Sequence, residues 1–168
     1  MSKVKMKELD WIATGKQYVG VREVKGARHN PNIQMMLKYL GAWWTDDETP
    51  WCGVFTAYCL KKNGIVIPKH WYRALDYKNY GAKLSKPCYG CIAIKTRKGG
   101  GHVTFVVGKT KDGRLVCLGG NQNDMVNYAV YSASDFEEFR WYGRTNTPLQ
   151  GRYDLPVLNV SATKVTEA

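Results

Sequence analysis

One cysteine of this chain, Cys52, lies at a position that favours a reactive thiol. Cys52 follows Pro50, and Val54, Phe55 and Tyr58 then recur at helical spacing, which predicts that Cys52 lies in the first turn of a helix. The unpaired backbone N–H groups and the positive end of the helix dipole favour a thiolate over a thiol at that position. Such a cysteine is a candidate nucleophile, and it needs a histidine to accept and return a proton.

His102 is the candidate base among the three histidines of the chain. It heads residues 102–108, whose branched and aromatic side chains predict a strand, and a turn at 111–114 leads into a second strand at 115–118. This hairpin is expected to bring Asn121 near His102. A thiol, an imidazole and an amide that orients the imidazole can perform acyl transfer, and the order Cys, His, Asn fits a papain-like core. Asn121 also lies in a run of glycine and amide residues, which is equally typical of a structural turn.

The surroundings of these three residues resemble the signature segments of a phage-associated branch of the CHAP domains, the cysteine, histidine-dependent amidohydrolases/peptidases. The resemblance extends from about residue 9 to residue 141, and it is carried by segments 47–52, 101–103 and 118–122, with 19–26 and 29–31 upstream.

The resemblance implies a role for each residue: Cys52 is the nucleophile, His102 the base and Asn121 the orienting residue. Some members of the family have a carboxylate in the third position. It also implies an endolysin-like enzyme that cleaves an amide bond of bacterial peptidoglycan. The enzyme is either an N-acetylmuramoyl-L-alanine amidase or an endopeptidase of the stem or cross-bridge peptides, and the sequence does not separate the two.

Aromatic residues gather near Cys52 in the sequence. Trp51 and Trp71 could form the floor of a groove for sugars and peptide, and Gly101 is a further candidate substrate-binding residue. Large aromatic side chains more commonly pack in a core. His29 and His70 are given no catalytic role, because a histidine taken singly is more commonly a surface residue.

Composition indicates an anionic partner. The chain has 168 residues, with 25 basic and 14 acidic side chains and a net charge of +11. This excess would attract peptidoglycan and anionic envelope polymers; it would also attract nucleic acid, but no specific nucleic-acid motif is present. Two alternatives to a phage lysis enzyme stay open: a non-catalytic basic module that binds cell wall or nucleic acid, and a toxin that attacks a competitor's wall. A monomer is expected.

The five cysteines are an odd number in a chain rich in ordinary core residues, which favours reduced thiols. Cys59 and Cys117 are predicted to be core residues. The basic N-terminus lacks the apolar region of a secretory signal, and no apolar stretch is long enough to span a membrane. The expectation is a protein made in the cytoplasm of a bacterial host, which acts on the wall after release.

Neither a metal nor another cofactor is expected. Cys88 and Cys91 have the spacing of half a zinc site, but no second pair of ligands follows. Asp46 and Asp47 could contribute to a calcium site, but the alternation of an EF-hand loop is missing. A solvated approach to the helix is the favoured interpretation of this acidic run.

These residues need elements to position them, and the pattern predicts an α+β, papain-like CHAP fold in which N-terminal helices pack on a C-terminal antiparallel sheet. Residues 1–143 are expected to form a single catalytic domain and residues 144–168 a tail, with no separate wall-binding domain. Segment 71–80 is a further helix or an irregular aromatic segment. Helices are predicted near 9–19, 31–40 and 52–63, and strands near 91–96, 102–108, 114–119, 126–131 and 138–142.

Overall fold

The computed structural model describes residues 6–24, 29–44 and 50–160, and these form an α+β structure. The predicted class is confirmed. Helices α1 (Asp10–Lys16), α2 (Pro31–Leu40) and α3 (Cys52–Lys62) come first in the chain, and a six-stranded antiparallel sheet follows. Among the described residues, no helix is long and apolar enough to cross a membrane.

The sheet has the strand order β1-β6-β2-β3-β4-β5. Five of its strands lie close to the predicted segments, and β1 was not predicted because three residues are too few to show an alternating pattern. The bounds are β1 (Ala82–Leu84), β2 (Ile92–Arg97), β3 (Gly100–Lys109), β4 (Leu115–Gln122), β5 (Met125–Tyr131) and β6 (Glu138–Trp141). Short 3-10 helices are η1 (Ala74–Asn79), η2 (Ala133–Asp135) and η3 (Gln150–Tyr153).

Helix α2 begins and ends at residues that favour helix ends. The Asn30 side chain accepts a hydrogen bond from the N–H of Asn32 and caps α2, Pro31 opens it, and Gly41 ends it in the left-handed conformation.

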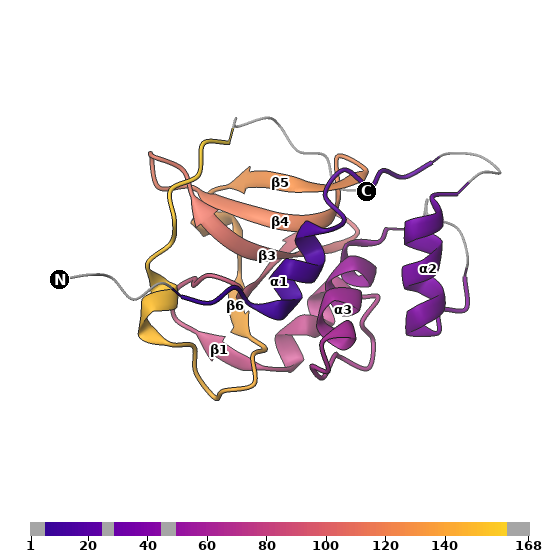
Figure 1. Ribbon diagram of the computed structural model, residues 1–168, viewed down its shortest axis with the longest axis horizontal. Coiled ribbons are helices and arrows are strands. Elements are labelled where there is room, and N and C mark those ends of the chain that lie inside the picture. Colours follow the sequence, from indigo (N-terminus) through magenta and orange to yellow (C-terminus); the bar gives the residue numbers. More distant parts are fainter. Residues whose placement is uncertain (1–5, 25–28, 45–49, 161–168) are drawn as a thin grey trace.

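Helix α3 is buried along its first nine residues, 52–60. It lies against β3 and β4 on one side and against α1 and α2 on others, as Figure 1 shows. The N-terminus of α3 is therefore held inside the molecule.

The C-terminal segment, predicted to be a tail, packs on the sheet as far as it is described. The backbone N–H of Lys109 donates to the Pro156 carbonyl at 2.9 Å, and the N–H of Leu158 donates to the Lys109 carbonyl at 2.8 Å. β2 pairs with β3 only as far as Phe105, so β2 does not cover the end of β3. The C-terminal segment pairs with β3 there, at Lys109 and Val157. The yellow trace in Figure 1 runs along the side of the sheet.

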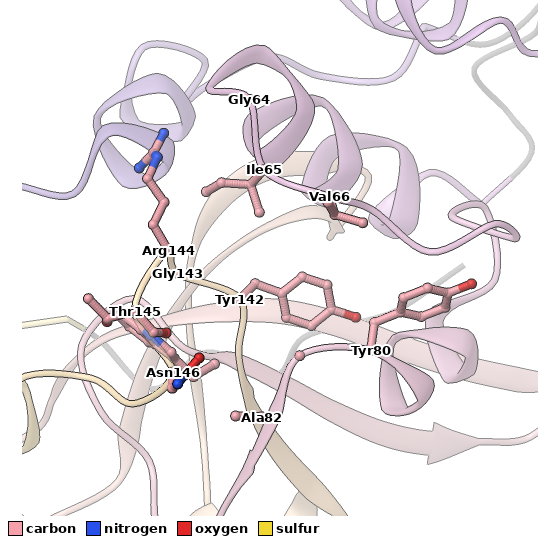
Figure 2. Close-up of a pocket in the computed structure, with 12 residues that line it drawn as sticks. Gly64, Ile65, Val66, Tyr80, Ala82, Tyr142, Gly143, Arg144, Thr145 and Asn146 are labelled. Atoms are coloured by element: carbon pink, nitrogen blue, oxygen red, sulfur yellow. The ribbon is translucent and has the colours of Figure 1, made fainter.

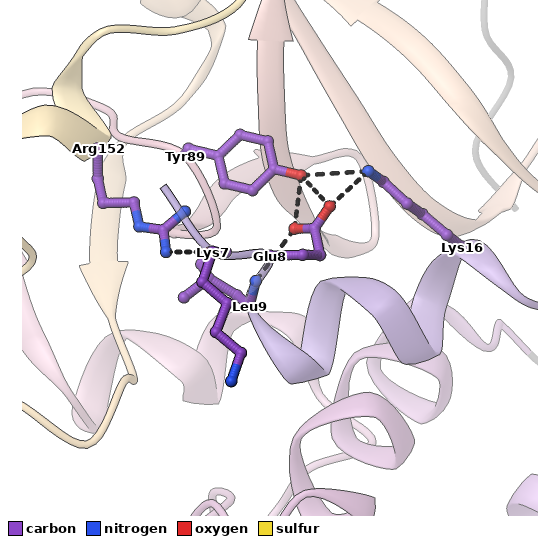
Figure 3. A network of polar contacts seen from close by, with 6 residues as sticks. All are labelled: Lys7, Glu8, Leu9, Lys16, Tyr89 and Arg152. Carbon is purple, nitrogen blue, oxygen red and sulfur yellow. Dashed lines mark hydrogen bonds and ion pairs between the residues drawn. The ribbon is translucent and has the colours of Figure 1, made fainter. Parts of the chain in front are cut away.

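A polar cluster joins the N-terminal segment to two later parts of the chain (Figure 3). The Lys16 ammonium lies 2.7 Å from a Glu8 carboxylate oxygen, and the Tyr89 hydroxyl donates to the same carboxylate at 2.8 Å. Arg152 of η3 donates to the Lys7 carbonyl. Burial opposes ionisation of Glu8, but these hydrogen bonds and the Lys16 charge outweigh it and lower the pKa of Glu8.

Candidate active site

Cys52 is the first residue of α3, and its side chain is 5% exposed. The buried hydroxyl of Tyr77, in η1, donates to the carbonyl of Gly53 at 2.8 Å and to that of Trp71 at 3.0 Å. A Cβ at Gly53 would lie 2.4 Å from the Trp71 oxygen, so glycine permits this close approach. η1 thereby fixes the first turn of α3, where backbone N–H groups have no partner within the helix.

Strand β3 supplies the groups that face the thiol. The side chain of His102, which is 1% exposed, and the backbone N–H of Val103 both hydrogen-bond Cys52. Burial opposes ionisation of the thiol. The hydrogen bonds and the positive charges of His102 and Arg97 outweigh burial and lower the pKa of Cys52. The nucleophile and base expected from the sequence are thus in contact.

Gln122 holds the far side of the imidazole. Its Oε1 lies 3.0 Å from His102 Nε2, and the Tyr131 hydroxyl donates to the same oxygen at 3.3 Å. Its amide nitrogen donates to the carbonyls of Cys117 and Asn127 at 3.3 and 3.1 Å, and to Asn127 Oδ1 at 3.0 Å. Because the nitrogen faces acceptors, the oxygen must face the imidazole, so Nε2 carries a proton and donates it. Nδ1 is left to exchange a proton with the thiol.

Asn121, the expected orienting residue, does not make this contact. Phe105 pairs with Leu118, and continuing that register would set Asn121 opposite His102. The backbone instead turns at Asn121, where φ is 57°, and the pairing of β4 with β5 shifts at the same place. This turn brings Gln122 to the imidazole. Asn121 Oδ1 is buried and has no hydrogen-bond partner among the residues that the structure describes.

Two glycines make room for this arrangement. A Cβ at Gly119 would lie 2.6 Å from Gln122 Oε1, and a Cβ at Gly120 would lie 2.6 Å from the Cβ of Phe55 in α3. The first glycine leaves space for the amide, and the second lets β4 approach the helix that carries the thiol. The only sequence signal for Gln122 is its place after this pair, which Asn121 shares.

The candidate substrate-binding residues occupy different places. Trp51 is 1% exposed, and its indole N–H donates to Glu23 at 3.2 Å. Trp71 is also buried, and it stacks on Trp44 with ring centroids 5.7 Å apart. Both rings therefore pack in the interior, which is the commoner use of large aromatics. Gly101 alone of the three lies in the wall of the cavity next to the thiol.

The other thiols are core residues. All five cysteines are buried and unbridged. Burial raises the pKa of Cys59 and Cys117; at Cys91, burial and the neighbouring Cys88 raise it. Within the described part of the chain, no group of three or more His, Cys, Asp and Glu side chains could hold a metal ion. The acidic run 46–48, considered above for calcium, lies outside the described residues.

The thiol opens into a cavity of about 320 Å³. A larger cavity, of about 700 Å³, lies elsewhere (Figure 2), and neither cysteine nor histidine lines it among the described residues. The chemistry therefore assigns the candidate site to the smaller cavity. The larger cavity is lined by Tyr80, Tyr142, Arg144, Asn146 and neighbouring residues of β1, β6 and the segment after α3.

Comparisons of the chain with protein-family models, with curated proteins and with solved structures find no match. The assignment of a function therefore rests on the contacts of Cys52, His102 and Gln122 and on the sequence.

Proposed function

We propose that the protein is a thiol hydrolase that cleaves an amide bond of bacterial peptidoglycan. The observation that carries this proposal is a buried Cys52 thiol at the start of a helix, in contact with His102, which is itself hydrogen-bonded to Gln122. A thiol in contact with an imidazole, which an amide orients, is an arrangement that can perform acyl transfer. The sequence resemblance to CHAP endolysins directs the proposal to peptidoglycan, and helices packed on an antiparallel sheet are compatible with a papain-like fold.

The first half of the reaction forms a thioester. The Cys52 thiolate attacks the amide carbonyl, and the backbone N–H of Cys52 at the start of α3 helps to stabilise the oxyanion. The protonated His102 then gives its Nδ1 proton to the leaving amine, and the C–N bond breaks. Gln122 keeps the imidazole in place throughout, because its oxygen accepts from Nε2 in both charge states.

The second half regenerates the enzyme. Neutral His102 takes a proton from water, and the resulting hydroxide attacks the thioester carbonyl. The C–S bond breaks, a carboxylic acid leaves, and the thiolate–imidazolium pair is restored. The scissile bond is either the amide between muramic acid and L-alanine or one within the stem or cross-bridge peptides. The protein would act as a monomer after release from the cytoplasm of the bacterial host.

The test is mass spectrometry of purified Gram-negative and Gram-positive peptidoglycan after incubation with the protein. New fragments are expected with the wild type and with Cys59→Ala, a control at another buried cysteine of α3, but not with folded Cys52→Ala. Loss of whole stems from muramic acid would identify an amidase, and cut stems or cross-links an endopeptidase. No fragments from any variant, with wall binding retained in Cys52→Ala, would replace the proposal by a binding module.

A further inference from the structure

The cavity beside Cys52 has a basic lining. It is formed by two parts of the chain: residues 50, 52 and 72–75, and residues 97 and 99–101. The first part contributes Arg73 and the second Arg97, and no acidic side chain is present among the described residues that line the cavity. Two arginines in the lining favour an anionic ligand over a cationic one.

Arg97 is the last residue of β2, where it pairs with Gly100 of β3, and it lines the same cavity as the thiol. Its Nε donates to the Gly101 carbonyl at 3.1 Å, and its side chain is half-buried. Its positive charge favours the Cys52 thiolate. Glycine at 101 permits a close approach to η1, since a Cβ there would lie 2.6 Å from Leu75 Cδ2.

Arg73 is held from the other side. Its guanidinium carbon lies 5.7 Å from the centre of the Tyr72 ring, a cation–π distance, and the Tyr72 hydroxyl is 2.9 Å from His70 Nδ1. The backbone N–H of Arg73 donates to the His70 carbonyl at 2.8 Å. This exposed guanidinium therefore has an aromatic support and an anchored backbone.

We propose that this cavity is a subsite for a carboxylate of the peptide substrate, which the two guanidinium groups bind while a neighbouring amide lies at the thiol. The inference rests on the proposed function and adds a substrate class to it: a peptide segment that is anionic next to the scissile bond. Guanidinium groups suit this task because their planar donors match a carboxylate in pairs. Peptidoglycan stems offer the α-carboxylate of glutamate and the carboxylate of the diamino acid.

Matched substrates test the subsite. The probes are two pairs of soluble muropeptides, in which the glutamate α-carboxyl or the diamino-acid carboxyl is either free or amidated. With wild-type protein, kcat/KM is expected to be about 10- to 100-fold higher for the free acid in one pair, the range of a hydrogen bond to a charged group. Equal values in both pairs would overturn the inference while leaving the proposed function intact.

Substitutions of the two arginines test whether they cause the preference for the free acid. Arg73→Gln and Arg97→Gln are each expected to reduce the ratio of acid to amide towards one, and Arg97→Lys to keep part of it. The ratio is the readout because Arg97 also favours thiolate formation, which affects both members of a pair equally. Lys98→Gln is the matched control, since it removes a positive charge from the residue next to Arg97, outside the cavity lining, and its ratio should equal that of wild type.

A binding measurement tests the carboxylate subsite independently of turnover. With folded Cys52→Ala protein, titration calorimetry should show about tenfold tighter binding of the free acid than of the amide in the same pair. Failure of wild type to cleave either probe would reject the proposed function, and the binding ratio would still decide the subsite. Equal affinities, or a ratio unchanged by Arg73→Gln and Arg97→Gln, would overturn the subsite.

Discussion

At the scale of single residues, the imidazole of His102 is kept in one tautomer by an amide whose own orientation is fixed by three acceptor contacts. The sequence predicted the thiol and the imidazole, because each has a local chemical signature: a helix start and the head of a strand. It did not predict Gln122. The selection of Gln122 over Asn121 depends on one left-handed residue in β4, and asparagine adopts this conformation readily without a distinct sequence pattern.

Two substitutions test which amide, that of Gln122 or that of Asn121, orients His102. Gln122→Ala should lower kcat about a hundredfold, because the imidazole loses its acceptor and its alignment. Asn121→Gly should stay within a few-fold of wild type, since glycine adopts the same φ and no hydrogen bond of the Asn121 oxygen is lost. Steady-state kinetics on a soluble muropeptide would measure both. The reverse order of activities would restore Asn121 as the orienting residue.

The reactivity of Cys52 should depend on pH in a defined direction. Its pKa is lowered from the ordinary value of a cysteine, so the thiolate persists to a lower pH than in an ordinary cysteine. The rate of alkylation by iodoacetamide, followed by intact-protein mass spectrometry, should therefore show an inflection below that value. In His102→Ala the inflection should move to higher pH, since burial is then opposed only by the Val103 N–H and the Arg97 charge. A wild-type inflection at or above the ordinary value would contradict the ion pair.

At the scale of elements, the site forms where α3 meets β3 and β4. Much of this was predictable: the limits of α2 and α3 and the β3–β4 hairpin follow from caps, turns and alternation. Two features were not. β1 is too short for a pattern, and residues 156–158 pair with β3 because an edge is open there, which depends on where β2 ends. Such pairings are properties of the assembled sheet.

The contact of α3 with β4 can be tested at Gly120. Gly120→Ala places a Cβ 2.6 Å from the Phe55 Cβ and 3.0 Å from the Trp51 ring, and it should lower the free energy of unfolding by about 1–3 kcal/mol. Gly151→Ala is the control, because its Cβ would meet nothing closer than Met6 at 3.5 Å, and its effect should stay within about 0.5 kcal/mol. Urea denaturation would measure both. Equal stabilities would show that the helix does not depend on this close approach.

At the scale of the whole molecule, the net charge of +11 acts over distances that no single contact covers. Salt shortens this range, from a Debye length of about 10 Å at 0.1 M to about 3 Å at 1 M. Attraction to an anionic wall should therefore weaken in salt more than the chemistry at Cys52 does.

Lysis of whole wall and cleavage of a soluble fragment should accordingly respond differently to salt. Turbidity clearing of purified wall is expected to slow several-fold between low and high NaCl, while turnover of a soluble muropeptide changes less, because its contacts lie in a partly enclosed cavity. Identical salt dependence in the two assays would show that the overall charge does not assist wall binding.

The separation of the reacting pair along the chain has a consequence for biosynthesis. Cys52 opens α3, whereas His102 and Gln122 lie on strands that the ribosome makes later. Until β3 and β4 have paired and α3 has docked, the thiol has no imidazole beside it and reacts as an ordinary cysteine. If Cys52 is the nucleophile that we propose, a nascent or truncated chain should be inert towards amide bonds until this contact has formed.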